Sequence, residues 1–287
     1  MRVGHQTSDD VVPYTQRTVD WSVHPSSKIK RLPAPLRPAA LAARNAADAI
    51  VRRRSPYEYE ADGFATRRFS PFLAGGDVEF NAAYDRTIRR WYPDHYVDIR
   101  WRAWLLTQFA RQFAGFPHEA PANFAEFGTY RAGCAELILS TVRFAAEQRF
   151  FLFDTFEGIP QNDQLTSGER NSAFVGRYRH TSVQYVERVL EPWEPRIEIC
   201  AGDVFDTLEH IDTGPLAWVH LDLNASAPTV RALDYAYQHI VSGGLILLDD
   251  YGDQMFAEQR RAVDKFLAET PEKAIPLPTG QAIILKR

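Results

Sequence analysis

The alternation of short apolar runs with helical segments after Pro121 constrains the fold of this chain more than any other feature. Strands are expected at residues 124–127, 150–153, 196–200, 217–221 and 245–248. Helices are expected between and after them at residues 134–147, 182–190, 229–240 and 255–269, and a closing antiparallel pair at 274–276 and 282–285. Strands that alternate with helices pack as a mostly parallel, doubly wound sheet. The sequence therefore predicts an α/β fold in which ligands bind at the carboxyl ends of the strands.

Composition narrows the class of protein. With 287 residues, of which 45% are hydrophobic and 13% aromatic, the chain can bury a sizeable core. The formal net charge of −4 gives no reason to expect nucleic acid as a partner. Cys134 and Cys200 lie in apolar segments without metal-ligand spacing, which indicates buried free thiols in a reducing compartment. No run of 18 apolar residues occurs, so we expect no membrane span and a cytoplasmic location.

Three regions are expected along the chain. Residues 1–77 are largely polar and rich in proline, with an alanine-rich helix at 38–54, and would form an N-terminal arm. Such an arm can reach a neighbouring subunit, so we expect a homodimer or a higher homo-oligomer. Within 78–121, apolar residues recur at helical spacing and Pro93 separates two helices, which would form a cap on the substrate side. Residues 122–287 would form the ligand-binding domain.

Residues 123–133, NFAEFGTYRAG, have the form of a strand, a tight turn and a helix N-terminus. This is the arrangement with which α/β proteins hold nucleotides. Glu126, Gly128 and Gly133 follow the spacing E-x-G-x-x-x-x-G rather than the G-x-G-x-x-G of dinucleotide enzymes. One looser glycine pair suits a ligand without a pyrophosphate, such as S-adenosylmethionine. Glycine turns after strands also occur without any ligand, so this stretch alone leaves both interpretations open.

Acidic residues stand where the second and third strands end. Asp154 follows the second strand, 21 positions after Gly133 (154 − 133). A carboxylate at about this distance from the glycine turn can accept hydrogen bonds from both hydroxyls of a ribose. Gly202 and Asp203 follow the third strand, where an acid can receive the amino group of adenine. The alternative is that Asp154 caps the next helix and that the Gly-Asp pair is an ordinary turn.

Three carboxylates and an amide follow the fourth and fifth strands: Asp222 and Asn224 in VHLDLN, and Asp249 and Asp250 in LLDDYG. Because neighbouring parallel strands end at one edge of a sheet, we expect these side chains to lie together. Unpaired carboxylates repel one another, so such a cluster shares a proton or binds a cation. Oxygen ligands favour Mg²⁺, Mn²⁺ or Ca²⁺ over Zn²⁺. The alternative is that Asp249 and Asp250 cap a turn while Asp222 faces solvent.

Several segments, in their order along the chain, carry a resemblance to a known family: AEFGTYRAG, FDTFEGIP, GDVFDTL, HLDLNASAPT, LILLDDYG and LPTGQAIILK. Over roughly residues 78–287 the chain resembles the macrocin O-methyltransferase family. The resemblance implies a Rossmann-like class I methyltransferase fold, with a mostly parallel seven-stranded sheet, flanking helices and here an N-terminal helical extension. It also implies S-adenosylmethionine and Mg²⁺ (or Mn²⁺ or Ca²⁺) as cofactors, and as acceptor a small molecule with a hydroxyl on a sugar or natural product.

Carried over by position, the resemblance implies a role for each matching residue. Asp222, Asp249 and Asp250 would hold the metal. From the chemistry of the reaction, and not from the resemblance, we expect Asp222 to accept the proton of the acceptor hydroxyl. His220, which shares the strand face of Asp222, is the alternative base. Many relatives carry D-G-D where this chain has Asn224 as the third residue, which leaves the metal affinity and the base open. The cofactor would be bound by Glu126, Gly128, Thr129, Tyr130, Gly133, Asp154, Thr155, Phe156, Gly202, Asp203 and Val204.

Three other functions remain open at this point. A catechol-type methyltransferase acting on a planar phenol would share the carboxylates, but Ala225 stands where such enzymes often use a lysine. A nicotinamide oxidoreductase would need the second turn glycine that residues 123–133 lack. A homologue that binds the cofactor without turnover would account for the departure at Asn224.

Overall fold

The computed structural model describes residues 33–36, 39, 43, 76–91, 97–114, 121–159, 165–170 and 176–287. Two compact units divide the chain, Met1–Ala42 and Ala43–Arg287. In the first, the described element is the 3-10 helix η1 (Ala34–Leu36); the sheet and the site lie in the second. The predicted helix at 38–54 lies outside the described residues except at positions 39 and 43, and so does Pro93. The three regions expected along the chain stay a prediction.

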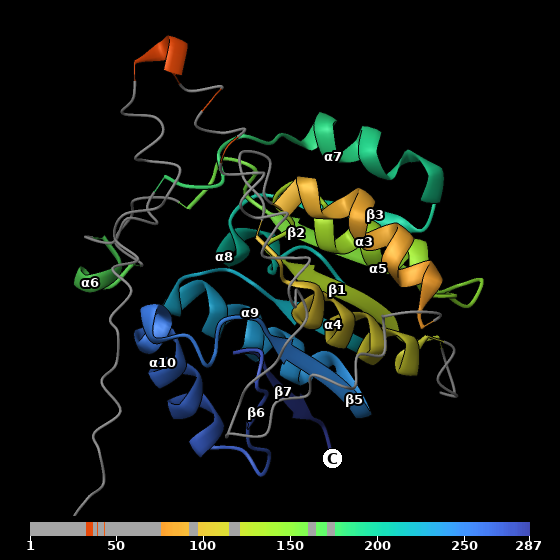
Figure 1. Ribbon diagram of the computed structural model, residues 1–287. Coiled ribbons are helices and arrows are strands. Elements are labelled where there is room, and N and C mark those ends of the chain that lie inside the picture. Colours follow the sequence, from red (N-terminus) through yellow and green to blue (C-terminus); the bar gives the residue numbers. More distant parts are fainter. Residues whose placement is uncertain are drawn as a thin grey trace, which may run out of the picture. The chain divides into compact units, whose positions relative to one another are not determined.

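One sheet contains all seven strands in the order β3-β2-β1-β4-β5-β7-β6 (Figure 1). These strands are β1 (Asn123–Phe127), β2 (Phe150–Asp154), β3 (Ile197–Ala201), β4 (Leu216–Leu221), β5 (Ile240–Leu248), β6 (Ile275–Pro276) and β7 (Ala282–Leu285). The first five run parallel, and β7 pairs antiparallel with β5 and β6. The predicted mostly parallel sheet and its closing antiparallel pair are therefore confirmed. The strand order reverses between β1 and β4, which is where such sheets bind ligands.

Helices cover both faces of this sheet (Figure 1). The helices described in this unit are α3 (Val78–Trp91), α4 (Arg100–Phe113), α5 (Gly133–Thr141), α6 (Ser167–Arg170), α7 (Val183–Leu190), α8 (Val204–Thr207), α9 (Ser226–His239) and α10 (Ala257–Ala268), with the 3-10 helices η2 (Glu191–Trp193) and η3 (Gln254–Phe256). Residues of α4, α5 and α7 pack on one face, and residues of α8, α9 and α10 on the other. Among the described residues, no helix combines the length and the apolar character that a membrane span requires.

Alternate residues of each central strand face opposite layers. In β1, Phe124 packs in the cluster with α4, α5 and α7, whereas Phe127 packs in the cluster with α8, α9 and α10. Strands buried on both faces read as nearly continuous apolar runs, and β1, β2 and β4 do so. Glu126 of β1 and His220 of β4 interrupt these runs with fully buried polar side chains, 0% and 3% exposed. Such residues need partners inside the core.

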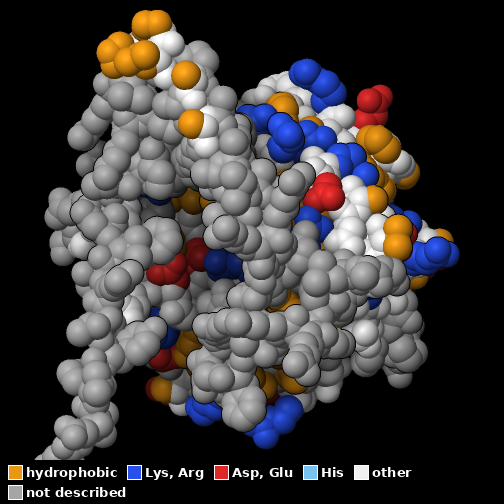
Figure 2. Space-filling view, in the orientation of Figure 1, with side chains coloured by type: hydrophobic (Ala, Val, Ile, Leu, Met, Phe, Trp, Pro, Cys, Tyr) orange, Lys and Arg blue, Asp and Glu red, His pale blue; other side chains and the backbone are white. Residues whose placement is uncertain are grey.

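The two helices predicted in residues 78–113 are α3 and α4. Phe80 and Tyr84 of α3 pack with Ala103 of α4 and Leu137 of α5 in a separate apolar cluster. Figure 2 shows Lys and Arg side chains gathered over this part of the molecule. In α3, Arg86 and Arg90 both pair with the buried carboxylate of Glu136 in α5. Apolar packing and these ion pairs together hold α3 against the helix that starts at the NFAEFGTYRAG turn.

The first helix after β1 is shorter than predicted. α5 ends at Thr141 rather than at residue 147. The side chain of Gln148 accepts a hydrogen bond from the backbone N–H of Ala145 (2.8 Å) and donates one to the carbonyl oxygen of Ala122 (2.8 Å). These bonds hold the residues before β2 in a turn, so they cannot continue the helix.

The fifth strand is longer than predicted. β5 begins at Ile240 rather than at residue 245. The backbone N–H of Gly243 donates to the carbonyl oxygen of Lys286 (2.7 Å), and the N–H of Lys286 donates to the carbonyl oxygen of Gly244 (3.0 Å). The two glycines are therefore an irregular part of the strand, as glycines inside strands often are, and not a turn in front of it.

Candidate functional site

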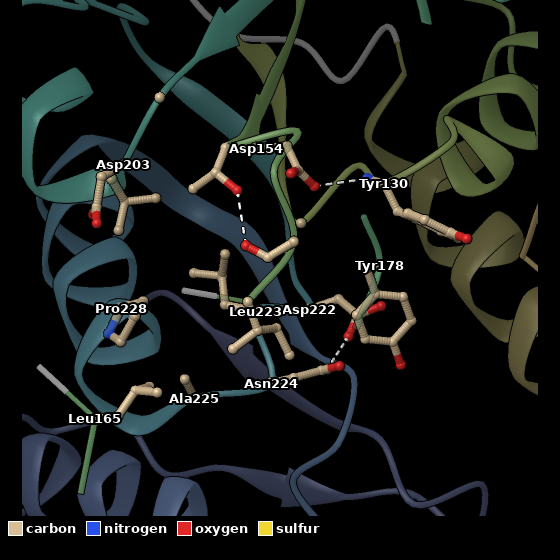
Figure 3. Close-up of a pocket in the computed structure, with 16 residues that line it drawn as sticks. Tyr130, Asp154, Leu165, Tyr178, Asp203, Asp222, Leu223, Asn224, Ala225 and Pro228 are labelled. Carbon is tan, nitrogen blue, oxygen red and sulfur yellow. Dashed lines mark hydrogen bonds between the residues drawn. The ribbon is translucent and has the colours of Figure 1, made fainter. Parts of the chain in front are cut away.

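A cavity opens where β1, β2, β3 and β4 end (Figure 3). Its walls are the turns after β1 and β2, the start of α8, and the loop between β4 and α9. The residues that line it are Gly128, Tyr130, Asp154, Thr155, Gly158, Ile159, Leu165, Tyr178, Gly202, Asp203, Val204, Asp222, Leu223, Asn224, Ala225 and Pro228. The cavity thus occupies the position that the strand order predicts for a ligand.

Gly128 allows the turn after β1 to approach the end of β4 closely. Its φ is +96°, and a Cβ placed there would lie 2.0 Å from the carbonyl oxygen of Asp222. Any other residue would clash with that backbone as well as being strained. The N–H of Gly128 donates to the carbonyl oxygen of Phe153 (2.8 Å), and the N–H of Asp222 donates to the carbonyl oxygen of Phe127 (2.8 Å). These contacts tie the ends of β1, β2 and β4 together.

The carboxylate of Asp154 organises the next wall. Its Oδ2 accepts a hydrogen bond from the N–H of Tyr130 (2.7 Å), drawn in Figure 3, and its Oδ1 accepts one from the N–H of Phe156 (2.7 Å). Burial raises the pKa of Asp154, although these two N–H groups act against that rise. Each carboxylate oxygen has a further lone pair. Asp154 can therefore hold the turn and still accept hydrogen bonds from ligand hydroxyls.

Three lining residues that are not glycine have a left-handed backbone. They are Tyr130 (φ 50°), Tyr178 (φ 64°) and Asn224 (φ 55°). Such conformations each cost about 1–3 kcal/mol and gather at functional sites. The Tyr130 and Tyr178 rings meet edge to face with centroids 5.1 Å apart. Backbone strain on the cavity wall is a second indication, separate from the cavity itself, that this surface binds a ligand.

Most of the predicted cofactor residues line this cavity: Gly128, Tyr130, Asp154, Thr155, Gly202, Asp203 and Val204. Glu126, Thr129, Gly133 and Phe156 do not. Gly133 lies against the ring of Trp91, where a Cβ would approach within 3.0 Å, and Thr129 and Phe156 are 3% and 6% exposed. Contact between the cofactor and any of these residues stays a prediction.

Asp203 also acts as a helix cap. Its Oδ1 accepts a hydrogen bond from the N–H of Phe205 (3.0 Å) at the start of α8. The second carboxylate oxygen remains available to a ligand, because Asp203 lines the cavity as well. For Asp203 the sequence offered an ordinary turn as the alternative, and a helix cap was not predicted; the cap is compatible with a binding role.

Several lining residues carry no sequence prediction. Leu223, Ala225 and Pro228 directly follow β4 in the segment HLDLNASAPT, so the position of that segment could have identified them. Leu165 and Tyr178 come from the polar segment between β2 and α7. That segment has no periodic pattern that would mark one side as a wall.

Glu126 and His220 form a buried pair behind the cavity. The strand register places them side by side, and Nδ1 of His220 lies 3.1 Å from Oε1 of Glu126 and 3.5 Å from Sγ of Cys134. Nε2 of His220 lies 3.5 Å from Oδ1 of Asp249. Burial acts to lower the pKa of His220, but Cys134, Asp249 and Glu126 outweigh it and hold this pKa well above its usual range. Neither Glu126 nor His220 lines the cavity, and their roles in cofactor binding and as a base stay predictions.

The three carboxylates expected at the ends of β4 and β5 lie together, beside the cavity that Asp222 lines. The amide of Asn224 joins two of them, with Nδ2 2.7 Å from Oδ1 of Asp222 and 2.7 Å from Oδ2 of Asp250. One oxygen of Asp222, one of Asp249 and a ring nitrogen of His220 lie within 4.8 Å of one another. The predicted cluster of side chains therefore exists, and Asn224 is part of it.

Arg102 of α4 reaches the same cluster. Its Nη2 lies 3.0 Å from Oδ2 of Asp249 and 3.0 Å from Oδ1 of Asp250. Gln281, just before β7, donates its side-chain N–H to Oδ1 of Asp249 (2.9 Å). Sequence reasoning missed Arg102 because it precedes Asp249 by 147 residues and lies in a helix whose apolar pattern indicates packing.

Arg102 does not neutralise the cluster. Burial acts to raise the pKa of Asp249, but Arg102 and His220 outweigh it and hold this pKa below its usual range. Burial and repulsion from Asp249 and Asp250 raise the pKa of Asp222 well above its usual range. Burial and repulsion from Asp249 also raise the pKa of Asp250 to about 7. Arg102 and His220 therefore stabilise the ionised form of Asp249, whereas the ionised forms of Asp222 and Asp250 are disfavoured unless a further cation lies beside them.

The donor set fits a divalent cation. The carboxylates supply oxygen atoms, which Mg²⁺, Mn²⁺ and Ca²⁺ prefer, and a bound cation would offset the repulsion that disfavours ionised Asp222 and Asp250. Asn224 now donates from its amide nitrogen, and a half turn of the amide would present its oxygen instead. Since Arg102 already contacts Asp249 and Asp250, a cation would have to share these carboxylates with the guanidinium.

A curated protein of known activity is similar in sequence. Over 139 residues the chain is 24% identical to the 8-demethyl-8-(2,3-dimethoxy-alpha-L-rhamnosyl)-tetracenomycin-C 4'-O-methyltransferase of Streptomyces olivaceus. The similarity covers 46% of this chain and 53% of that protein. The chain thus spans about half the length of this relative.

Two solved structures are similar in fold. The O-methyltransferase NovP superposes with a TM-score of 0.56 and 23% identity, over 64% of this chain and 79% of NovP. A calicheamicin methyltransferase superposes with a TM-score of 0.55 and 17% identity, over 79% of this chain and 98% of that enzyme. At these identities the likeness shows a common fold, and it confirms the predicted methyltransferase fold.

A family model identifies the chain more closely. The model of the macrocin O-methyltransferase (TylF) family matches residues 111–277, which is more than half of the 287-residue chain. The matched range contains β1–β5, every residue that lines the cavity, and the three clustered carboxylates. The resemblance inferred from the sequence motifs is confirmed, and the chain belongs to the macrocin O-methyltransferase (TylF) family.

Proposed function

We propose that this protein is an S-adenosylmethionine-dependent O-methyltransferase that acts on a hydroxyl of a sugar or a glycosylated natural product. One observation carries the proposal. A single cavity runs from the Gly128 turn and Asp154 to Asp222, which belongs to a carboxylate cluster suited to a divalent cation. Membership of an O-methyltransferase family supports the reaction class. The curated relative, whose name places its methyl group on a rhamnosyl tetracenomycin, supports the class of acceptor.

The cavity wall offers each part of S-adenosylmethionine a suitable partner. Asp154 would accept hydrogen bonds from the ribose hydroxyls, since its carboxylate has lone pairs left beyond the two backbone N–H groups. Asp203 would receive the adenine amino group. Gly128 and Tyr130, at the turn after β1, would face the methionine end. The sulfonium methyl group would then point toward Asp222 and Asn224.

Methyl transfer is an in-line displacement. The acceptor oxygen attacks the methyl carbon, the bond between that carbon and sulfur breaks with its electron pair on sulfur, and the hydroxyl proton leaves. We assign the proton to a carboxylate oxygen of Asp222, because Asp222 lines the cavity and His220 does not. The amide of Asn224 orients that carboxylate by donating to its Oδ1. Rigid strand ends hold both residues, so the reacting atoms can be kept at near-attack distance.

Asp222, Asp249 and Asp250 would hold a divalent cation, most suitably Mg²⁺. When bound, the cation would lower the pKa of the acceptor hydroxyl, which is otherwise a poor acid. Asn224 in place of an acid leaves the donor set one charge weaker. After a half turn of its amide, Asn224 would be a neutral oxygen ligand and would no longer donate to Asp222.

The proposal is tested by incubating the protein with S-adenosylmethionine, Mg²⁺ and a rhamnosylated tetracenomycin, and measuring S-adenosylhomocysteine and methylated product by mass spectrometry. We expect turnover that falls by about 10²–10⁴-fold in Asp222→Asn. Chelation of the metal should lower turnover as well. Asp264→Asn, at a hydrogen-bonded surface residue of α10, is the matched control and should retain activity.

Other outcomes would favour other functions. Turnover of catechols but not of glycosides would identify a phenol methyltransferase. Cofactor binding without turnover across both acceptor types would identify a binding homologue. Thermal stabilisation by NAD but not by S-adenosylmethionine would contradict the proposal. Full activity in both Asp222→Asn and chelated enzyme would refute the assigned base and the metal.

A further inference from the structure

Glu126, Cys134 and His220 bring three kinds of donor atom together in the core behind the cavity. An oxygen of Glu126 in β1, the sulfur of Cys134 in α5 and a ring nitrogen of His220 in β4 lie within 4.8 Å of one another. All three side chains are buried. We propose that this trio binds one zinc ion, which joins β1, α5 and β4 to one another.

The donor set distinguishes this trio from the carboxylate cluster. The oxygen atoms of the cluster suit Mg²⁺ or Ca²⁺, whereas a thiolate is a soft ligand that selects zinc. Cysteine, histidine and glutamate are all zinc ligands. The spacing along the chain did not indicate this site, because its donors come from positions 126, 134 and 220 on three different elements.

Zinc would also balance the charge of the trio. A thiolate at Cys134 and a carboxylate at Glu126 carry two negative charges, and the ion carries two positive ones. Buried charges are tolerated only where they are compensated. Oε2 of Glu126, which is 0% exposed, has no hydrogen-bond partner among the residues that the structure describes. A buried carboxylate oxygen without a partner indicates a missing group, and zinc beside Glu126 would supply it.

The spacing of the donor atoms fits a tetrahedral ion. Zinc bonds of about 2.3 Å to sulfur and about 2.0–2.1 Å to nitrogen and oxygen place two ligand atoms about 3.3–3.6 Å apart. Nδ1 of His220 lies 3.5 Å from Sγ of Cys134 and 3.1 Å from Oε1 of Glu126. The side chains therefore need to move by only a few tenths of an ångström to hold the ion.

Zinc at this position would also act on the carboxylate cluster. If the ion binds Nδ1 of His220, the ring proton lies on Nε2, which is 3.5 Å from Oδ1 of Asp249. Histidines bound to a metal almost always donate their other N–H to a carboxylate, a backbone carbonyl or water. His220 would thus be a positioning residue for Asp249. A ring that holds both a metal and a proton cannot act as a base, which is consistent with Asp222 in that role.

The test uses the full chain produced in medium supplemented with Zn²⁺, or with Co²⁺, whose bond to a thiolate gives a charge-transfer band in the near ultraviolet. After dialysis against a chelator, we expect about one zinc ion per chain and, in the cobalt protein, the band. Removing a group that only orients a ligand costs about 10–100-fold in metal affinity, so Cys134→Ser should lower the zinc content at least tenfold and abolish the band. Cys200→Ser is the matched control, because Cys200 is also a buried free thiol but lies in β3. Asp250→Asn should keep both signals, since the carboxylate cluster is a separate site.

Each outcome decides the proposal. Wild-type protein without the band, or with no more zinc than Cys134→Ser, would overturn the site. If Cys134→Ser does not fold, Cys200→Ser decides, because Cys134 is then the one cysteine left in the chain. The band must persist in that variant, and its loss would overturn the site. Zinc and the band without methyl transfer would leave the site standing and overturn the proposed function, whereas methyl transfer without zinc or the band would do the reverse.

Discussion

The two halves of the site are built in different ways. At the ends of β1 and β2, the backbone makes the shape: Gly128 approaches the carbonyl of Asp222, and Asp154 binds the N–H groups of Tyr130 and Phe156. At the ends of β4 and β5, side chains from distant elements make it, and Arg102 of α4 is the farthest of them. The first half is therefore held by local chain geometry and the second by a balance of charges. Strain should damage the first, and a change of charge the second.

The largest effect is expected where the two halves touch. Gly128→Ala would place a Cβ 2.0 Å from the carbonyl oxygen of Asp222 at a φ of +96°. Left-handed strain of about 1–3 kcal/mol and overpacking of about 1–3 kcal/mol add, so we expect a loss of about 4 kcal/mol in the free energy of unfolding. Gly280→Ala is the matched control, because its φ is +85° but nothing lies within 4 Å of its Cβ. Equal losses in chemical denaturation would mean that strain alone matters and that the close approach does not.

The buried pair behind the cavity tests the charge balance of the second half. His220→Leu would leave the fully buried Glu126 without its partner, which costs about 3–5 kcal/mol. Replacing both Glu126 and His220 by leucine should restore most of that loss, because an apolar pair leaves no buried charge. His239→Leu, which removes a ring stacked on Tyr235 but no buried carboxylate contact, is the control. If the losses in the free energy of unfolding of the two single variants, measured in urea, add up to that of the double variant, the two residues do not interact.

A smaller effect is expected at the wall of the first half. Asp154→Asn replaces one carboxylate oxygen, a proposed acceptor for a ribose hydroxyl, by an amide nitrogen, and a hydrogen bond to a charged group contributes about 1.5–3 kcal/mol. We expect the Kd of S-adenosylhomocysteine, measured by calorimetry, to rise about 30-fold. Asp203→Asn should raise the Kd of S-adenosylhomocysteine less, because asparagine caps the N-terminus of a helix, here α8, as well as aspartate does. The reverse order would place the ribose at Asp203 instead of Asp154.

The two halves also differ in how well the sequence predicted them. Strand ends and turn glycines are local, so Gly128, Asp154 and Asp203 could be found from apolar runs and their spacing. The meeting of Asp222 with Asp249 and Asp250 followed from parallel strands ending at one edge. The burial of the Glu126 side chain away from the cavity could not be predicted, because it depends on the strand register that pairs Glu126 with His220. Arg102 could not be seen either, since nothing within α4 distinguishes a residue that contacts β5 from one that faces solvent.

The smallest effect, at Arg102, decides what the charge balance of the second half is for. If the guanidinium competes with a cation for Asp249 and Asp250, Arg102→Met should bind Mg²⁺ about tenfold more tightly by calorimetry, or about 1.4 kcal/mol. Arg111→Met is the control, because Arg111 lies in the same helix with 24% exposure against 23% for Arg102, and pairs with Asp77 away from the site. Weaker Mg²⁺ binding in Arg102→Met would show the opposite: that Arg102 orients the carboxylates for the cation. The second half would then be preorganised like the first, but by a side chain instead of by the backbone. The remaining difference would be that Arg102 lies 147 residues before the carboxylate that it orients, whereas the backbone contacts of the first half are local.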